Sequence, residues 1–592
     1  MPAGSARIDF SDPYMPDGPR LRHAYEHPRR TLVAHEPAPV RSVLDAVQAA
    51  AEQGFWCVGY LRYEAAPAFD SALVVHATQG PLAWFAVYDE ALPWPADTSA
   101  NANANAAQLQ WKAACSRADF DAAVDKIHTA IANGELYQVN FTAPLHGVLL
   151  SKPVGDWALA LFAALQRAQP KGYAAFLDTG DGQLLSVSPE LFFDWHANRI
   201  LTRPMKGTAP RGATPAEDTA LEQALRASAK ERAENVMIVD LLRNDLSRIA
   251  EPFSVQVPRL FHTEALPTVW QMSSDVLART RASCSLADVF AALFPSGSVT
   301  GAPKVSAMRM INALEPAARG VYCGAFGVVR PGEKTIHATF NVPIRTVTLQ
   351  GSAATCGIGS GITSSALVEA EWQEWRHKRA FVERASSPFD LLETLALEDG
   401  VLRDAPAHLA RMASAAAHFG YPCSQVQQCL QQLVQTHPKG NWRVRLLLDA
   451  QGKARAEAFV LLPSPQRVRL QLANRALNEA HGEFVRFKTT RRSHYDAFTP
   501  IQPDVFDTLL WNNEGEITEC TRGNIALLLE GRWLTPPLHC GLLGGIGRAN
   551  ALQTGRLTEG VVCVDDLPQV EALAFVNSLR GWLDAELDPR KE

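Results

Sequence analysis

The 592-residue sequence lacks the patterns that mark several large classes of protein. Its ten cysteines include no CxxC pair, which argues against a zinc or iron–sulfur centre and against a disulfide framework. No uninterrupted apolar run approaches the roughly 18 residues of a membrane-spanning helix, and the N-terminus lacks the apolar core of a signal peptide. We therefore expect a reduced, cytoplasmic protein that has no membrane partner.

The sequence also has no excess of positive charge. Its 56 Lys and Arg residues against 62 Asp and Glu residues give a formal net charge of −6. Proteins that bind nucleic acid usually carry a basic surface, so nucleic acid is not an expected partner. The length indicates roughly three or four structural units at about 150 residues each.

Two stretches of unusual composition divide the chain. Residues 97–105 are rich in alanine and asparagine and are expected to form a loop or linker. Residues 385–388 place small residues before a proline, which predicts a domain joint. We therefore expect three segments, at residues 1–110, 111–384 and 385–592.

Apolar patterns predict both strands and helices. We expect strands at 56–61, 82–88, 442–448, 458–462 and 468–472, and helices at 120–131, 218–249 (one or two) and 408–419.

Two pairs of glutamates repeat the same helical spacing. Glu231 and Glu234 are three residues apart, as are Glu371 and Glu374, so each pair projects from one face of its predicted helix. Four carboxylates that faced one another would repel unless a cation lay between them. Oxygen ligands without His or Cys suit Mg²⁺. On spacing alone, two solvated helix faces are the more common explanation.

Five motifs in the first part of the chain occur in a characteristic order. They are GELYQVN at 134–140, RPMKGTAPR at 203–211, KERAEN at 230–235, FPSGSVTGAPK at 294–304 and GIGSGI at 357–362. Together they resemble the chorismate-utilising enzymes, from anthranilate synthase to isochorismate synthase. The resemblance implies an αββα sandwich within an α/β (α+β) chain, with residues 1–110 as its N-terminal part and 111–384 as the chorismate-binding catalytic domain.

The resemblance also assigns a substrate and a metal. The four glutamates would surround a Mg²⁺ ion that grips the ring carboxylate of chorismate, with Glu234 and Glu374 as the direct ligands. Arg345 would make a bidentate carboxylate contact, and the three glycines would bring backbone N–H groups close to a carboxylate. The implied substrate contacts are Gln138, Thr300, Tyr322, Arg345, Gly357, Gly359 and Gly361.

Two positions discriminate between the reactions of this family. Isochorismate and salicylate synthases carry a water-activating lysine where Gln138 stands, and an amide cannot act as a general base at neutral pH. Anthranilate synthases usually carry alanine where Lys206 stands. A lysine amine could attack C2 of chorismate and expel the C4 hydroxyl, after which ammonia would enter at C4. Lys206 therefore favours the branch that makes 4-amino-4-deoxychorismate.

One departure and one absence qualify this prediction. Many relatives have a histidine where Gln271 stands, and its absence leaves the acid that assists the C4 hydroxyl unnamed. No glutamine-hydrolysing motif is visible, so ammonia would come from solution or from a separate glutamine amidotransferase subunit.

The last third of the chain carries a second set of motifs. They are HLAR at 408–411, FKTT at 487–490, GEITECTRGN at 515–524, TPP at 535–537, GGIGR at 544–548 and NSLRG at 577–581. In this order they resemble the fold-type IV pyridoxal phosphate enzymes, which have two subdomains and include branched-chain aminotransferases and aminodeoxychorismate lyase.

This second resemblance implies a role for each matching residue. Lys488 would carry the cofactor and move a proton, and Glu519 would hold the pyridine nitrogen protonated. The phosphate would be bound by Arg411, by the backbone N–H groups of Ile546 and Gly547 at the start of a helix, and by the hydroxyl of Ser578. Gly544 stands where relatives usually show proline, so we expect a looser phosphate loop.

The motifs of the second block do not separate a lyase from an aminotransferase, but the fusion favours one of them. The product of the first half would be the substrate of the second. We therefore expect a bifunctional folate-pathway enzyme that takes chorismate to 4-aminobenzoate and pyruvate, with a possible homodimer through the pyridoxal phosphate domain. The alternatives are an anthranilate synthase component fused to an aminotransferase, and a synthase with a non-catalytic C-terminal scaffold.

Overall fold

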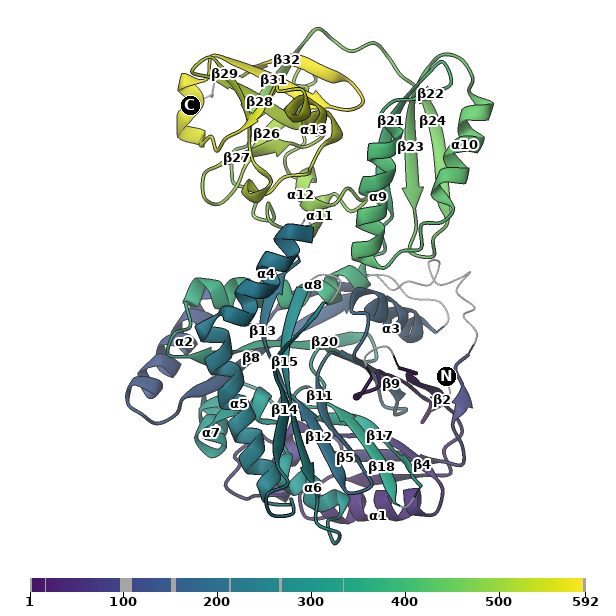
Figure 1. The fold of residues 1–592 in the computed structure, drawn as a ribbon, viewed down its shortest axis with the longest axis vertical. Coiled ribbons are helices and arrows are strands. Elements are labelled where there is room, and N and C mark those ends of the chain that lie inside the picture. The colour runs from purple at the N-terminus through teal and green to yellow at the C-terminus, as the bar shows by residue number, and fades with distance from the viewer. Residues whose placement is uncertain are drawn as a thin grey trace. The chain divides into compact units, whose positions relative to one another are not determined.

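The computed structural model describes residues 3–15, 18–95, 109–150, 156–211, 215–265, 269–333 and 335–588. The expected linker at 97–105 lies outside these residues. The chain folds into two compact units, Met1–Pro388 and Phe389–Glu592 (Figure 1). The break between them follows the proline of the expected joint.

Two antiparallel sheets form the first unit. From one edge to the other, the first sheet has the order β16 (Gly301–Ala302), β8 (Gln138–Leu149), β20 (Ala353–Thr363), β19 (Thr346–Gln350), β10 (Gln183–Ser188), β9 (Tyr173–Asp178), β1 (Ala6–Phe10), β2 (Leu21–Tyr25) and β6 (Leu92–Pro93). In addition, β7 (Leu109–Ala113) pairs with β8.

Within the described residues the second sheet has ten strands, as the first does. Its order is β13 (Met205–Pro210), β15 (Val269–Arg279), β12 (Arg199–Arg203), β11 (Leu191–His196), β18 (Ile336–Asn341), β17 (Ala325–Pro331), β4 (Trp56–Leu61), β5 (Ala83–Tyr88) and β3 (Arg30–Ala34), and β14 (Gln256–Ala265) pairs with β15. Strands from both sides of residue 110 enter both sheets. The N-terminal segment is therefore not a separate compact unit.

The two sheets pack face to face, and helices cover their outer faces. Side chains such as Phe10, Tyr60 and Phe326 fill the space between the sheets. Helices α2 (Arg117–Ala132), α3 (Trp157–Ala168), α7 (Lys304–Leu314) and α8 (Val368–Ser386) contribute to the core on the first sheet. This arrangement is the expected αββα sandwich.

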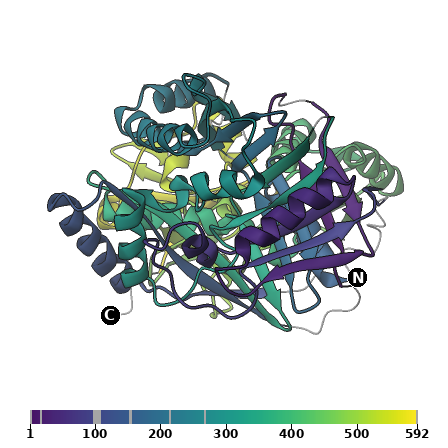
Figure 2. The same cartoon turned by 90° about the horizontal axis from the view of Figure 1, so that it is seen from below.

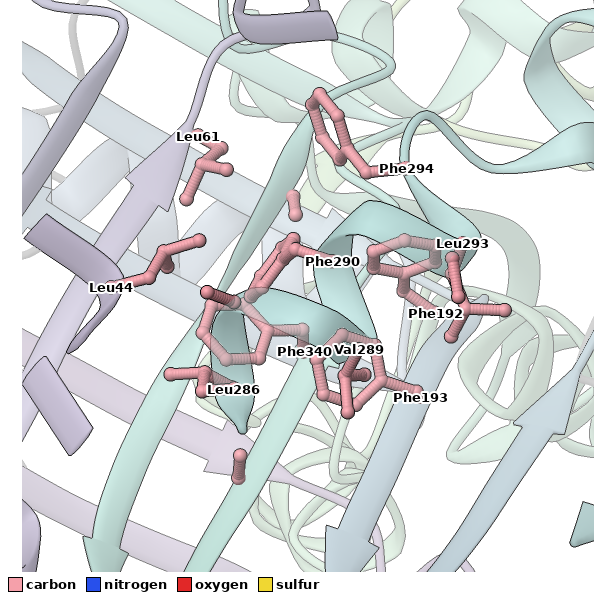
Figure 3. Packing of buried hydrophobic residues seen from close by; sticks show 14 of the residues in the cluster. Leu44, Leu61, Phe192, Phe193, Leu286, Val289, Phe290, Leu293, Phe294 and Phe340 are labelled. Carbon is pink, nitrogen blue, oxygen red and sulfur yellow. The ribbon is translucent and has the colours of Figure 1, made fainter. Parts of the chain in front are cut away.

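A phenylalanine-rich core joins the helices to the second sheet. Figure 2 shows α1 (Val40–Glu52) lying across the strands, and α6 (Leu286–Leu293) and α5 (Ala229–Ser247) contribute to the same cluster. Phe193, Phe290 and Phe340 meet at its centre (Figure 3), with Phe290 and Phe340 rings 5.1 Å apart in an edge-to-face contact. This core fixes α5, the first of the two glutamate-bearing helices.

The predicted helix at 218–249 is two helices, α4 (Pro215–Ala227) and α5. They are separated by Ser228, whose hydroxyl accepts a hydrogen bond from the backbone N–H of Glu231 at 3.3 Å. Serine favours such a helix N-cap position because it satisfies a free N–H group of the first turn. The other predicted elements are present, within a few residues at their ends.

The second unit has two subdomains, as expected. One is a sheet of β22 (Val401–Leu402), β21 (Leu391–Glu398), β23 (Asn441–Leu448) and β24 (Ala454–Val460), which packs with α9 (Ala405–Phe419) and α10 (Val426–Thr436). The other has the order β27 (Ile517–Cys520), β26 (Asp507–Trp511), β25 (Arg467–Leu472), β32 (Gly581–Leu587), β31 (Ala572–Asn577), β28 (Asn524–Leu529), β29 (Arg532–Thr535) and β30 (Thr558–Glu559).

Three short helices complete the second unit: α11 (Glu483–Arg486), α12 (Ser493–Asp496) and α13 (Ile546–Gln553). None of the helices in the described part of the chain is both long enough and apolar enough to cross a membrane.

Candidate active sites

Two helices bring the four glutamates of the first unit together. Glu231 and Glu234 lie on α5, and Glu371 and Glu374 lie on α8. Lys230 connects the helices, because its Nζ lies 4.0 Å from Glu234 Oε1 and 3.8 Å from Glu371 Oε1. The glutamates therefore form one cluster rather than two separate solvated faces.

Burial and mutual repulsion change the acidity of this cluster. Burial is the main cause that raises the pKa of Glu231, Glu234 and Glu371; neighbouring carboxylates add to the rise, and nearby lysines oppose it. Burial would also raise the pKa of Glu374, but Lys378, Lys206 and Lys230 outweigh it and lower that pKa. Carboxylates that repel one another in a partly buried site are a suitable ligand set for a hard cation such as Mg²⁺.

Lys206 lies beside Gln138 over a bare glycine. A methyl group built on Gly361 would meet Gln138 Nε2 at 2.5 Å and Lys206 Nζ at 2.7 Å. The Lys206 charge also acts on Glu231, Glu234 and Glu374. The lysine and glutamine that discriminate between reactions thus share one site with the glutamate cluster.

The glycines 357, 359 and 361 lie on a strand, β20, rather than in a turn. They alternate along it, so they leave one face of the strand without side chains. The ring of Tyr322 occupies the space over Gly357. Thr142 packs in the same way against Gly359, and the Gln138 amide and the Lys206 amine face Gly361, so polar side chains approach the strand closely at its end.

Glu190 is an ionisable residue of this site that the sequence interpretation missed. It lies between β10 and β11, is only 4% exposed and accepts a hydrogen bond from Ser298. Burial raises its pKa to about 7, although Ser298, Lys206 and Lys378 oppose that rise. A buried carboxyl group with a pKa near neutrality can serve as a general acid. The only sequence signal was a carboxylate in a tight link between two apolar strands.

Lys378 was also missed. Its Nζ lies 2.6 Å from Glu374 Oε1 and donates to the carbonyl oxygen of Gly359 at 2.9 Å. It is one helical turn after Glu374, a spacing that could have indicated it.

Gln271 supports the segment that bears Lys206. Its Nε2 donates to the carbonyl oxygen of Gly207 at 2.9 Å and to that of Met272 at 3.2 Å. Where many relatives have a proton-transferring histidine, this chain therefore has an amide that holds the backbone next to the lysine.

Arg345 and Thr300 have different surroundings. Arg345 adopts a left-handed backbone conformation with φ of 51°, which is rare for this residue type and typical of functional sites. Burial and the charge of Arg384 lower its pKa to about 10, and no carboxylate within the described residues pairs with it. A half-buried arginine in this state favours an anionic ligand. Thr300 is fully buried and donates to the carbonyl oxygen of Ser296 at 3.1 Å.

In the second unit, Lys488 and Glu519 lie in one buried site. Burial, followed by the charges of Arg492 and Arg411, lowers the pKa of Lys488 to about 8. Burial raises the pKa of Glu519 to about 7. Tyr495, which the sequence interpretation did not single out, donates to Glu519 Oε1 at 2.6 Å, and the N–H of Leu543 donates to Oε2 at 3.1 Å.

The expected phosphate-binding residues meet at the start of α13. Ile546 and Gly547 form its first turn, and a methyl group built on Gly547 would meet the backbone of Asn577, the neighbour of Ser578, at 2.6 Å. Arg411 Nη1 donates to the carbonyl oxygen of Gly544 at 3.1 Å, and Glu393 holds the same guanidinium through contacts of 2.6 and 2.8 Å. Free N–H groups at a helix start and a fixed guanidinium suit a phosphate group.

Comparison with family models identifies both units. The model described as chorismate binding enzyme matches residues 12–384, which is more than half of the chain. The chain belongs to the chorismate binding enzyme family. A second model, described as amino-transferase class IV, matches residues 390–586.

Curated relatives match about half of this chain. The chain is 38% identical over 314 residues to aminodeoxychorismate synthase component 1 of Klebsiella aerogenes, covering 52% of this chain and 67% of the relative. It is 37% identical over 264 residues to the protein of the same name from Escherichia coli (strain K12), covering 45% and 56%. It is also 37% identical over 278 residues to anthranilate synthase component 1 3 of Haloarcula marismortui, covering 47% and 54%. The matches thus span about half to two thirds of these relatives.

Solved structures share the fold of the first unit. Anthranilate synthase component I from Streptococcus pneumoniae is similar with a TM-score of 0.53 at 23% identity, over 64% of this chain and 93% of that one. A putative 2,3-dihydroxybenzoate-specific isochorismate synthase from Bacillus anthracis has a TM-score of 0.51 at 19% identity, over 64% and 96%. At these identities the likeness concerns the fold alone.

Proposed function

We propose that the first unit converts chorismate and ammonia to 4-amino-4-deoxychorismate, and that the second converts this product to 4-aminobenzoate and pyruvate. The observation that carries the first half is Lys206, which lies beside Gln138 at the bare face of β20 and close to the glutamate cluster. The relatives include anthranilate synthases at similar identity, so this lysine, rather than overall similarity, supports the choice of reaction.

The glutamate cluster would hold Mg²⁺, with Glu234 and Glu374 as direct ligands and Glu231 and Glu371 around them. When bound, the ion would supply positive charge that fixes the ring carboxylate of chorismate. Arg345 would bind the other carboxylate, and its lack of a carboxylate partner within the described residues supports this role.

The amine of Lys206 would attack C2 while the bond from C4 to its hydroxyl breaks. Glu190 would give its proton to the departing oxygen, which leaves as water. Ammonia would then form a bond to C4, and the bond between C2 and the lysine nitrogen would break, which frees the enzyme. The raised pKa of Glu190, about 7, supports its assignment as the acid that the sequence left unnamed.

Ammonia would come from a separate glutamine amidotransferase subunit. The designation component 1 of the relatives supports this, because it implies a second component. Folate biosynthesis in the cytoplasm and pairing of the second units into a homodimer belong to the same proposal and rest on the family resemblance.

In the second unit, bound pyridoxal phosphate would supply an electron sink for the electrons left on C4. Its phosphate would be held by Arg411, by the N–H groups of Ile546 and Gly547 and by the hydroxyl of Ser578. Glu519 would hold its ring nitrogen. Lys488 would take the C4 proton. The lowered pKa of Lys488, about 8, leaves part of the lysine as a free base near neutral pH. The enolpyruvyl group would leave as the ring becomes aromatic, and it would be released as pyruvate.

The Lys488→Ala variant tests the division of labour. We expect it to lose the visible absorbance of the bound cofactor and to accumulate 4-amino-4-deoxychorismate from chorismate and ammonia, while the wild type proceeds to 4-aminobenzoate. Wild-type protein without cofactor absorbance, or an unchanged product in the variant, would favour a scaffold role for the second unit.

A further inference from the structure

Gln138 is a buried side chain whose polar atoms have no partner. The residue is 0% exposed, and neither Oε1 nor Nε2 of its amide has a hydrogen-bond partner among the described residues. Buried amides are almost always hydrogen-bonded. A fully buried amide with both ends unpaired therefore indicates a group that is satisfied only in the working enzyme.

The backbone of Gln138 is fixed by its neighbours. Gln138 is the first residue of β8 and pairs with Thr363 of β20 on one side and with Ala302 of β16 on the other. Gly301 packs directly against the Gln138 carbonyl oxygen, where no side chain would fit. Two strands and a glycine contact thus fix the backbone from which this side chain extends.

Lys206 Nζ is the polar group that faces the same glycine. The Gln138 amide and the Lys206 amine lie 2.5 and 2.7 Å from the position that a Cβ atom would occupy on Gly361. The two ends of an amide exchange by a half-turn about its last bond, so its oxygen can face the amine.

We infer that Gln138 is a positioning residue for Lys206: its carbonyl oxygen accepts a hydrogen bond from the amine and aims the amine nitrogen at C2 of chorismate. An amide oxygen suits this task, because it can orient the amine without adding a further charge to the site. The inference rests on the proposed nucleophilic role of Lys206.

The test is the Gln138→Met variant, which keeps the length of the side chain and removes its hydrogen bonds. Purified full-length protein is mixed with chorismate and Mg²⁺, and the adduct on Lys206 is measured by rapid quenching and mass spectrometry. We expect the rate of adduct formation to fall by about tenfold or more, because misaimed reacting groups lose much of their rate. The Kd of chorismate should change by less than about threefold.

The matched control is Gln169→Met. Gln169 is also a buried glutamine, 8% exposed, but it caps the end of α3, which contributes no residue to the site. This control should form the adduct at the wild-type rate.

A Gln138→Met variant with a weaker Kd and an unchanged adduct rate would overturn the inference, because Gln138 would then only bind substrate. If this variant does not fold, Gln138→Asn withdraws the same amide by one methylene group and should show the same loss of rate. Wild-type protein that forms no adduct while still making the para product would refute the proposed nucleophile itself, a separate result.

Discussion

Lys206 is the residue on which the proposed reaction depends most. We expect Lys206→Ala to slow formation of 4-amino-4-deoxychorismate by at least about a hundredfold, because the covalent route is removed. Chorismate should still bind, since the glutamate cluster and Arg345 remain. The measurement is a product assay together with a binding assay. Para product at the wild-type rate would reduce the lysine to an electrostatic role.

The raised pKa of Glu190 leads us to expect that the first reaction depends on pH. Burial raises its pKa to about 7, so the carboxyl group is protonated below that pH and ionised above it. Because the proposed acid must be protonated, kcat/KM for chorismate should fall as pH rises through about 7. Glu190→Gln should be slow at every pH and lack this step, as a pH profile of both proteins would reveal. A wild-type profile that stays level from pH 6 to about 8 would contradict the assignment.

Local pattern reveals some of these residues and conceals others. Lys206, Lys488 and the glutamates stand in motifs with a recognisable spacing, so the sequence predicts them. Glu190 stands alone between two apolar strands, and its importance depends on burial and on Ser298 and Lys206, which are distant in sequence. Tyr495 is similar, because its role follows from a hydrogen bond to Glu519, 24 residues away.

The helices α5 and α8 act as a pair, and their glutamates can be tested together. We expect Glu234→Gln and Glu374→Gln each to reduce chorismate turnover by at least about a hundredfold at limiting Mg²⁺, because the ion loses a charged ligand. Conversion of aminodeoxychorismate by the second unit should be unaffected. Near-normal chorismate turnover in both variants would contradict the metal site.

A matched control lies on the same helix. Glu369 of α8 faces solvent, with its side chain 62% exposed, and pairs with Arg117. Glu369→Gln removes the same charge from α8 away from the cluster, and we expect it to turn over chorismate normally.

The close packing of Gly547 at the start of α13 can be tested by adding one methyl group there. In Gly547→Ala the new Cβ atom would meet the backbone of Asn577 at 2.6 Å, a distance that requires the backbone to move. We expect weaker binding of pyridoxal phosphate, by about tenfold or more, because the N–H groups of this turn would no longer point at the phosphate. Titration of the apoprotein with cofactor, followed by absorbance, measures this. Unchanged affinity would place the phosphate elsewhere.

Individual helices and strands were easier to predict than the pairing of strands within the sheets. Apolar runs predicted β4 and β5, and helical spacing predicted α2 and α9, because these signals are local. The pairing of β8 with β20, about 220 residues apart, has no local signal. For the same reason the expected boundary at residue 110 does not separate compact units, since strands from both sides enter the same sheets. The glycine triplet lies on β20, whose partner strand β8 is equally distant in sequence.

For the whole molecule, the order of the two units in one chain carries the functional argument. A chorismate binding enzyme unit precedes a class IV aminotransferase unit. The class IV motifs alone do not distinguish a lyase from an aminotransferase. The proposed lyase activity rests on chemistry, because an amine placed at C4 by the first unit is a substrate that the second could use.

The most direct test of the central claim is the identity of the aromatic product. Purified full-length protein is incubated with chorismate, Mg²⁺, pyridoxal phosphate and an ammonium salt, and the product is identified by chromatography and mass spectrometry. We predict 4-aminobenzoate and pyruvate in equal amounts. Anthranilate, the ortho isomer, would contradict the account.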